Sequence, residues 1–130
     1  MKILVGYDGS QCARDALKLA AEHARAFKAQ VVVAATVDTA SITYEADVNN
    51  AKEDLAFAAE WYASENVDYE TQLLDRGLTP GESLVKWAEE NGVGEIVIGV
   101  KRRSKVGKLL FGSTAQYVIL SAPCPVVTIR

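Results

Sequence analysis

The chain has 130 residues, of which 49% are apolar and 24% are charged, and its formal net charge is −3. One compact domain is expected at this length, and the composition excludes a low-complexity or disordered chain. No apolar run approaches the roughly 20 residues that cross a bilayer, and the mild acidity argues against nucleic acid as a partner of the whole surface. Cys12 and Cys124 belong to no CxxC or Cys/His pattern, so neither a zinc site nor a disulfide framework is predicted. We expect a cytoplasmic protein with one domain, residues 1–130, and no membrane partner.

Short β-branched runs recur along the chain and predict strands. Four of these runs are almost uninterrupted, which is typical of strands buried on both faces of a parallel sheet. They cover residues 3–5, 31–37, 96–98 and 126–129. A fifth run, residues 67–73, alternates apolar and polar side chains, which predicts a strand at the edge of the sheet with one solvated face.

Helical patterns lie between the strands. Apolar residues recur at spacings of three and four, which predicts helices with one buried face, in residues 13–27, 48–62 and 84–88. Ser10 is in position to cap the first of these helices. A fourth helix is expected to follow Gly112 and to end before Pro123.

Strands and helices therefore alternate along the whole chain. With right-handed crossovers, this order predicts a three-layer, doubly wound α/β sandwich. In such sheets ligands bind beyond the carboxyl ends of the strands, where the strand order reverses. If the first strand is central, the loops after the first and fourth strands flank that crevice. Those loops are residues 7–10 and 99–103.

Residues 99–114 combine the features of a phosphate site. Five basic residues and no acid follow the fourth strand: Lys101, Arg102, Arg103, Lys105 and Lys108. The segment ends where a helix is expected to begin, and the free N–H groups and positive dipole of a helix start favour phosphate. Gly112 permits close approach, and Ser113 and Thr114 add hydroxyl donors. The alternatives are an ordinary joint with Ser113 as N-cap, a solvated loop, or a basic patch for RNA or an acidic partner.

Asp8 ends the first strand at the mouth of the expected crevice. Its carboxylate is suited to accept a hydrogen bond from an adenine amino group or a ribose hydroxyl. Alternatively, it is a turn residue whose side chain accepts from the amides of Gly9 and Ser10. Gly99 would leave flat space for a ribose or a base. The lone histidine, His23, is expected to be solvated or packed rather than catalytic, because no second residue of a triad accompanies it.

Five motifs then occur in order along the chain: Val5-Gly6-Tyr7-Asp8-Gly9-Ser10, Gly77-x-x-Pro80, Ile96-Val97-Ile98-Gly99, Gly112-Ser113-Thr114-Ala115-Gln116 and Pro123-Cys124-Pro125-Val126-Val127. Each motif alone is weak. Together, at these spacings, they make the chain similar to the universal stress protein family over essentially its whole length. The resemblance implies a five-stranded parallel sheet of order 3-2-1-4-5 with four helices.

Many members of that family bind ATP through the pattern G-x2-G-x9-G-[S/T]. Gly99 matches its first glycine, Gly112 its third and Ser113 its hydroxyl, but Arg102 stands where the second glycine belongs. A side chain there either blocks the close approach that glycine allows, or supplies a bidentate phosphate contact through its guanidinium group. The resemblance implies an adenine-nucleotide site, with Asp8 and Val37 at the adenine, that is formed by Tyr7, Asp8, Val37, Ile98, Gly99, Arg102, Arg103, Gly112, Ser113 and Thr114.

The expected function is that of a stress-response sensor or regulator that binds ATP or AMP, with Mg²⁺ accompanying ATP. No catalytic residue and no metal site of the protein itself is expected, and hydrolysis of ATP would be slow at most. The resemblance also implies a homodimer formed by antiparallel pairing of the last strand, residues 125–130. The alternative is a nucleotide-free dimerisation or protein-docking module of the same fold, because members of that kind lack part of the glycine pattern.

Two other classes fit less well. An adenylating or nucleotide-hydrolysing enzyme on the related fold requires a Ser-Gly-Gly-x-Asp-Ser loop after the first strand, and residues 7–10 supply only fragments of it. A response-regulator receiver requires a pair of acids after the first strand. Asp8 stands alone there, although Asp75 occupies the place of a phosphoacceptor after the third strand.

Overall fold

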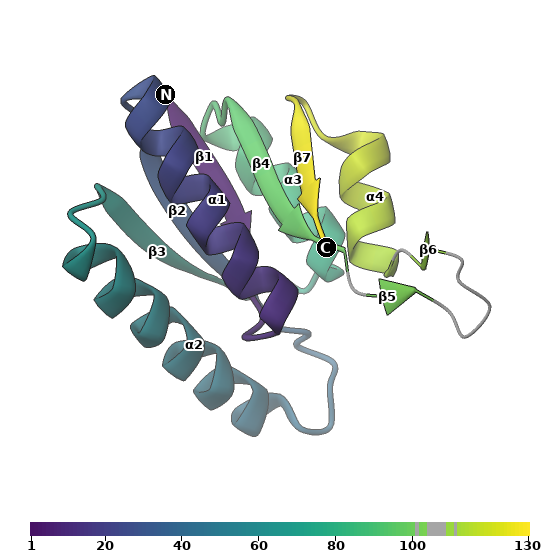
Figure 1. The fold of residues 1–130 in the computed structure, drawn as a ribbon. Helices are drawn as coiled ribbons and strands as arrows, with labels where there is room; N and C mark the ends of the chain where they lie inside the picture. Colours follow the sequence, from purple (N-terminus) through teal and green to yellow (C-terminus); the bar gives the residue numbers. More distant parts are fainter. Residues whose placement is uncertain (101, 104–108, 111) are drawn as a thin grey trace.

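The computed structural model describes residues 1–100, 102–103, 109–110 and 112–130 (Figure 1). In chain order the elements are β1 (Lys2–Gly6), α1 (Gln11–Phe27), β2 (Gln30–Thr36), α2 (Tyr44–Ser64), β3 (Tyr69–Leu74), α3 (Pro80–Glu90), β4 (Glu95–Gly99), β5 (Arg102–Arg103), β6 (Leu109–Leu110), α4 (Ser113–Ser121) and β7 (Val126–Ile129). Five strands form one parallel sheet in the order β3-β2-β1-β4-β7, and β5 pairs with β6 in a separate antiparallel ribbon. The predicted doubly wound α/β class and strand order are confirmed.

The central strand β1 is buried because it has a neighbour on each side and helices on both faces. Leu4 pairs with Val32 of β2 and with Ile96 of β4, and all three side chains are fully buried. One core lies between the sheet and helices α1 and α2, and a second lies between the sheet and helices α3 and α4 (Figure 1). This is why the strands read as continuous apolar runs.

Helix α1 begins as its sequence predicts. The Ser10 hydroxyl accepts a hydrogen bond from the Ala13 amide, and the helix ends at Lys28 in the left-handed conformation, with φ of 55°. The predicted apolar stripe is buried up to Ala24. Phe27, however, is 51% exposed. The apolar periodicity therefore continues one helical turn beyond the buried part of the stripe.

Strands β3 and β7 are the two edges of the sheet, as predicted for each of them. Residue burial in β3 does not alternate cleanly, because Glu70 and Gln72 are partly buried and are hydrogen-bonded to each other while Thr71 is exposed. Within the part of the chain that is described, no helix combines the length and hydropathy needed to cross a membrane.

Candidate functional site

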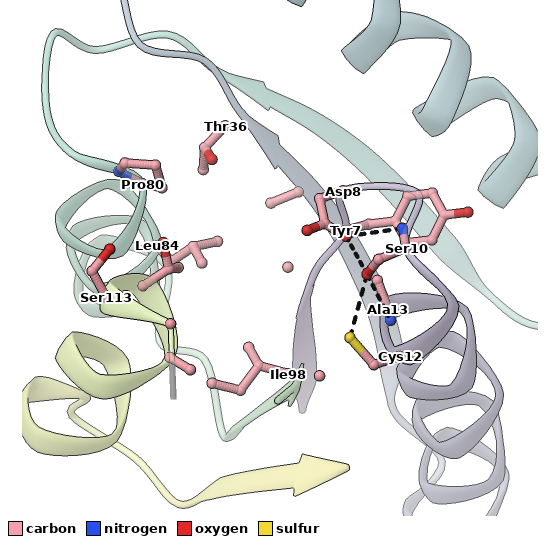
Figure 2. Close-up of a pocket in the computed structure, with 16 residues that line it drawn as sticks. Tyr7, Asp8, Ser10, Cys12, Ala13, Thr36, Pro80, Leu84, Ile98 and Ser113 are labelled. Carbon is pink, nitrogen blue, oxygen red and sulfur yellow. Dashed lines mark hydrogen bonds between the residues drawn. The ribbon is translucent and has the colours of Figure 1, made fainter. Parts of the chain in front are cut away.

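A pocket of about 310 Å³ opens at the carboxyl ends of β1 and β4, where the strand order reverses (Figure 2). This is the crevice that the doubly wound topology predicts, and the volume suits a small ligand. The described lining consists of Gly6, Tyr7, Asp8, Ser10, Cys12, Ala13, Ala34, Thr36, Pro80, Leu84, Ile98, Gly99, Gly112, Ser113, Thr114 and Ala115.

Three helices begin at this pocket, and their first turns differ. In α1 the Ser10 hydroxyl serves as cap, and in α3 Thr79 and Glu82 form a complete capping box. In α4 the N-cap is Gly112, which provides no side-chain hydrogen bond, and the first turn contains no acidic residue. Among the described residues, no side chain caps the amide groups at the start of α4, and with the positive end of the helix dipole these groups favour an anion.

Ser113 is the first residue of α4 and not its N-cap. The alternative in which Ser113 is an ordinary capping residue is therefore wrong, because Gly112 has the extended backbone of the cap position, with φ of −64° and ψ of 159°. A β-carbon at Gly112 would meet no protein atom within 4 Å among the described residues. Neither φ nor packing against the described residues requires glycine here, whereas close approach of a ligand would explain it.

The turn after β1 is held by Asp8. One carboxylate oxygen, Oδ1, accepts hydrogen bonds from the amide of Ser10 at 3.0 Å and from the hydroxyl of Ser10 at 2.6 Å (Figure 2). The turn role that the sequence offered is thus observed for the Ser10 amide. Asp8 is also exposed and lines the pocket, so the same carboxylate that orders the turn contributes negative charge to the pocket wall.

Tyr7 contributes mainly its backbone to the pocket. Its ring points away from the pocket (Figure 2) and stacks on Phe57 of α2, with ring centroids 6.5 Å apart and planes 6° apart. Burial raises the pKa of the Tyr7 hydroxyl, and Asp54 and Asp8 add to this effect, while Arg14 opposes it by a hydrogen bond and by its charge. The hydroxyl is therefore neutral at physiological pH.

Seven of the ten residues predicted for the site come together in the described lining: Tyr7, Asp8, Ile98, Gly99, Gly112, Ser113 and Thr114. Val37 does not. It is 4% exposed and belongs to the core beneath α1 and α2, and Thr36, one residue earlier, lines the pocket instead.

The predicted basic contacts lie in the segment that is only partly described. Arg102 and Arg103 form β5, and nothing of their side chains is described. Lys101, Lys105 and Lys108 fall outside the described residues. Their role therefore remains a prediction from the sequence.

Sequence reasoning missed the wall formed by β2 and α3. Ala34 and Thr36 line the pocket from β2, and Pro80 and Leu84 line it from α3. The predicted strand order places β2 and β4 on the two sides of β1, so the carboxyl end of β2 could have been expected to line the crevice as well. Pro80 belongs to the Gly77-x-x-Pro80 motif, but it is 73 residues from Tyr7 in the sequence, and only the fold brings the two to one pocket.

His23 lies away from this pocket, near the opposite end of β4. Its Nδ1 atom is 2.6 Å from Oε1 of Glu95, a buried residue at the start of that strand. The pair joins α1 to the sheet. Within the described ranges, no group of three or more His, Cys, Asp or Glu side chains is arranged to hold a metal ion.

Comparison with known proteins extends over the whole chain. The sequence profile of the Universal stress protein family matches residues 1–130. A relative from Thermus aquaticus, the universal stress protein in the QAH/OAS sulfhydrylase 3′ region, is 31% identical, over 98% of this chain and 97% of its own length. A universal stress protein structure from Archaeoglobus fulgidus is 39% identical with a TM-score of 0.92, and covers 100% of this chain and 98% of its own.

A further solved structure contains a nucleotide. It is the universal stress protein from Archaeoglobus fulgidus in complex with dAMP. It is 35% identical to this chain with a TM-score of 0.86, and the match covers 100% of this chain and 98% of that one. A relative with the same fold and more than one-third identical residues therefore binds an adenine nucleotide.

Proposed function

The chain belongs to the universal stress protein family, and from this premise we propose that it binds an adenine nucleotide in the pocket between β1 and β4. The start of α4 is the observation that carries the proposal. Its amide groups have no side-chain cap among the described residues, and its first turn has no acid. A phosphate group supplies the acceptors that this helix start requires.

The lining around the helix start suits the rest of a nucleotide. The Ser113 and Thr114 hydroxyls add donors for phosphate oxygens. The small or apolar side chains of Ala34, Leu84 and Ile98 provide a surface for a flat base. The dAMP complex of the relative supports this assignment by analogy.

Whether the ligand is AMP or ATP with Mg²⁺ depends on the segment after β4. Its sequence concentrates basic residues beside the helix start, and such a local positive field favours several phosphate groups. We assign Arg102 as a phosphate contact in place of the second glycine of the family pattern, because a guanidinium group can bind phosphate through two parallel hydrogen bonds. In this proposal the protein is a cytoplasmic stress sensor or regulator that hydrolyses ATP slowly at most.

The proposal includes a homodimer formed through β7. Support comes from the position of β7 at the edge of the sheet and from its hydrogen bonds to β4. The amides of Ile96 and Val100 donate to the carbonyl groups of Pro125 and Ile129, which therefore point inward. Because these directions alternate along a strand, the amide and carbonyl of Thr128 point outward, where a second copy can pair with them.

The test is to denature the purified protein and identify any released nucleotide by mass spectrometry. The emptied protein is then titrated by calorimetry with AMP, and with ATP and Mg²⁺. We expect about one nucleotide per chain, and loss of binding in Gly112→Val, since the branched side chain would occupy the space at the start of α4. Ser121→Val, at the other end of α4, is the matched control and should bind normally.

The variant Arg102→Ala separates the two roles considered for that residue. Weaker binding would support a phosphate contact, whereas tighter binding would mean that the side chain obstructs the site. If the protein carries no nucleotide and takes up no heat at millimolar AMP or ATP, the nucleotide proposal is overturned. The nucleotide-free dimerisation or docking module then becomes the better assignment.

A further inference from the structure

The turn that forms one wall of the pocket is contacted from outside by helix α2. Gly9 lies in this turn with φ of +80°, a conformation that side-chain-bearing residues rarely adopt. A β-carbon at this position would also be 2.8 Å from Oδ1 of Asp54. The Asp54 carboxylate therefore lies against the backbone of the turn, where a side chain at position 9 would collide with it.

The contact between α2 and the turn has a second component. Phe57, one helical turn after Asp54, stacks on Tyr7, and the guanidinium group of Arg14 lies over the Phe57 ring at 5.0 Å from its centroid. Asp54 and Phe57 thus contact both residues that flank Asp8, namely Tyr7 and Gly9. Asp8 and Ser10 line the pocket from the same turn, so α2 contacts the segment that carries these pocket residues.

The charges around Asp54 are consistent with a functional contact. Burial raises the pKa of the Asp54 carboxyl above its ordinary value, the negative charges of Asp8 and Glu53 raise it further, and Arg14 opposes them. A carboxylate in this environment loses favourable hydration and gains repulsion from Asp8. Such an arrangement costs stability, and costs of this kind are concentrated at functional sites.

We propose that Asp54 is a positioning residue for the pocket: through its contact with Gly9 it fixes the turn that carries Asp8 and Ser10, and so increases nucleotide affinity. The inference rests on the proposed nucleotide-binding function. Asp54 does not line the pocket, and it acts through the turn rather than by touching the ligand.

The test compares AMP affinity in three variants by calorimetry. Asp54→Ala removes the contact and should weaken AMP binding by about fivefold, which corresponds to about 1 kcal/mol of binding free energy. Asp54→Asn keeps the shape and one oxygen and should restore wild-type affinity. Glu60→Gln removes a charge from an exposed position farther along the same helix and should leave AMP affinity unchanged.

Two patterns of affinity would overturn the inference. In one, Asp54→Ala binds AMP as tightly as the wild type. In the other, Asp54→Asn and Asp54→Ala both bind more tightly, which would show that Asp54 acts by repelling the phosphate rather than by positioning the turn.

A second measurement does not depend on nucleotide. The Ser10 amide donates to Asp8, so in the free wild-type protein its hydrogen exchange should be slowed. Asp54→Ala should accelerate exchange at Ser10, while exchange in β2 and β4 stays at the wild-type rate. If exchange at Ser10 does not change, the positioning role is overturned even where AMP binds. If exchange at Ser10 accelerates but the wild-type protein binds no nucleotide, the nucleotide-binding proposal is overturned, and with it any role of Asp54 in nucleotide affinity. The contact between Asp54 and the turn is then still supported.

Discussion

Gly99 at the end of β4 lies directly against Cys12 in the first turn of α1. A β-carbon at position 99 would be 2.7 Å from both the carbonyl carbon and the Sγ atom of Cys12, and 2.8 Å from its carbonyl oxygen. Both residues line the pocket. The sequence offered space for a ribose or a base as the reason for Gly99, and the structure adds a second reason, since the close approach of a helix and a strand at the pocket floor requires a residue without a side chain.

Replacement of Gly99 should therefore destabilise the fold. Two of the three close atoms belong to the Cys12 backbone, so Gly99→Ala forces α1 away from β4, at a cost of about 1–3 kcal/mol in the free energy of unfolding. Denaturant titration measures this. Gly112→Ala is the control, since its β-carbon meets no described atom within 4 Å, and it should cost less. Equal stability of Gly99→Ala and wild type would contradict the close contact.

Cys124 should react slowly with an alkylating reagent. Burial raises the pKa of the Cys124 thiol, and the charge of Glu95 adds to the effect. Since the thiolate is the reactive form, Cys12→Ser, which retains Cys124, should be alkylated more slowly near pH 7.5 than a free thiol. Iodoacetamide labelling followed by mass spectrometry measures the rate.

The same labelling also reports pocket occupancy. In Cys124→Ser the remaining thiol, Cys12, lines the pocket, so saturating AMP should slow its alkylation. Labelling of Cys124 in the Cys12→Ser variant serves as the control and should not respond to AMP. Unchanged labelling of Cys12 at an AMP concentration that calorimetry shows to be saturating would place the ligand elsewhere.

The free energy of unfolding should depend on pH through the titration of the Asp54 carboxyl. Its pKa is raised above 3.8 chiefly by burial, so in the window between 3.8 and the raised value the folded protein binds a proton that the unfolded chain has released. Stability from this group is therefore complete below pH 3.8 and is lost as pH rises through the folded pKa. The Asp54→Asn variant has no such loss.

The expected result is that the free energy of unfolding of wild type falls relative to that of Asp54→Asn as pH rises from 3.8 through the raised pKa of Asp54. Denaturant titrations at several pH values provide the measurement. Asp15→Asn on α1 is the matched control for a change of net charge. A difference between Asp54→Asn and wild type that is independent of pH, or that has the opposite slope, would contradict the assignment.

The dimer prediction can be tested at one backbone group. The outward amide of Thr128 is available for a partner, so Thr128→Pro should remove that hydrogen bond while the inward bonds of Pro125 and Ile129 to β4 remain. We expect a monomer in sedimentation at micromolar concentration. Thr128→Val keeps the amide and should remain a dimer. A folded Thr128→Pro protein that sediments as a dimer would exclude pairing through this edge.

The features that could be predicted from the sequence are those that depend on residues close together in the chain. Uninterrupted β-branched runs and a helical period of three and four depend on residues near one another in the chain, so the α/β class and the strand positions followed from them. The Ser10 cap did as well, because cap and amide are three residues apart. The phosphate-suited start of α4 could be anticipated, although its cap is Gly112 and not Ser113.

The tertiary structure decided which faces of these elements meet at the pocket. Thr36 rather than Val37 lines it, the Tyr7 ring turns away toward Phe57, and Pro80 approaches from the far side of the sheet. The contacts of Gly99 with Cys12 and of Gly9 with Asp54 join residues far apart in the chain. The sequence alone determined the elements and the polar groups at their ends. Only packing of the helices on the sheet decided which of those groups share one cavity, because that packing depends on side-chain volumes contributed by distant segments.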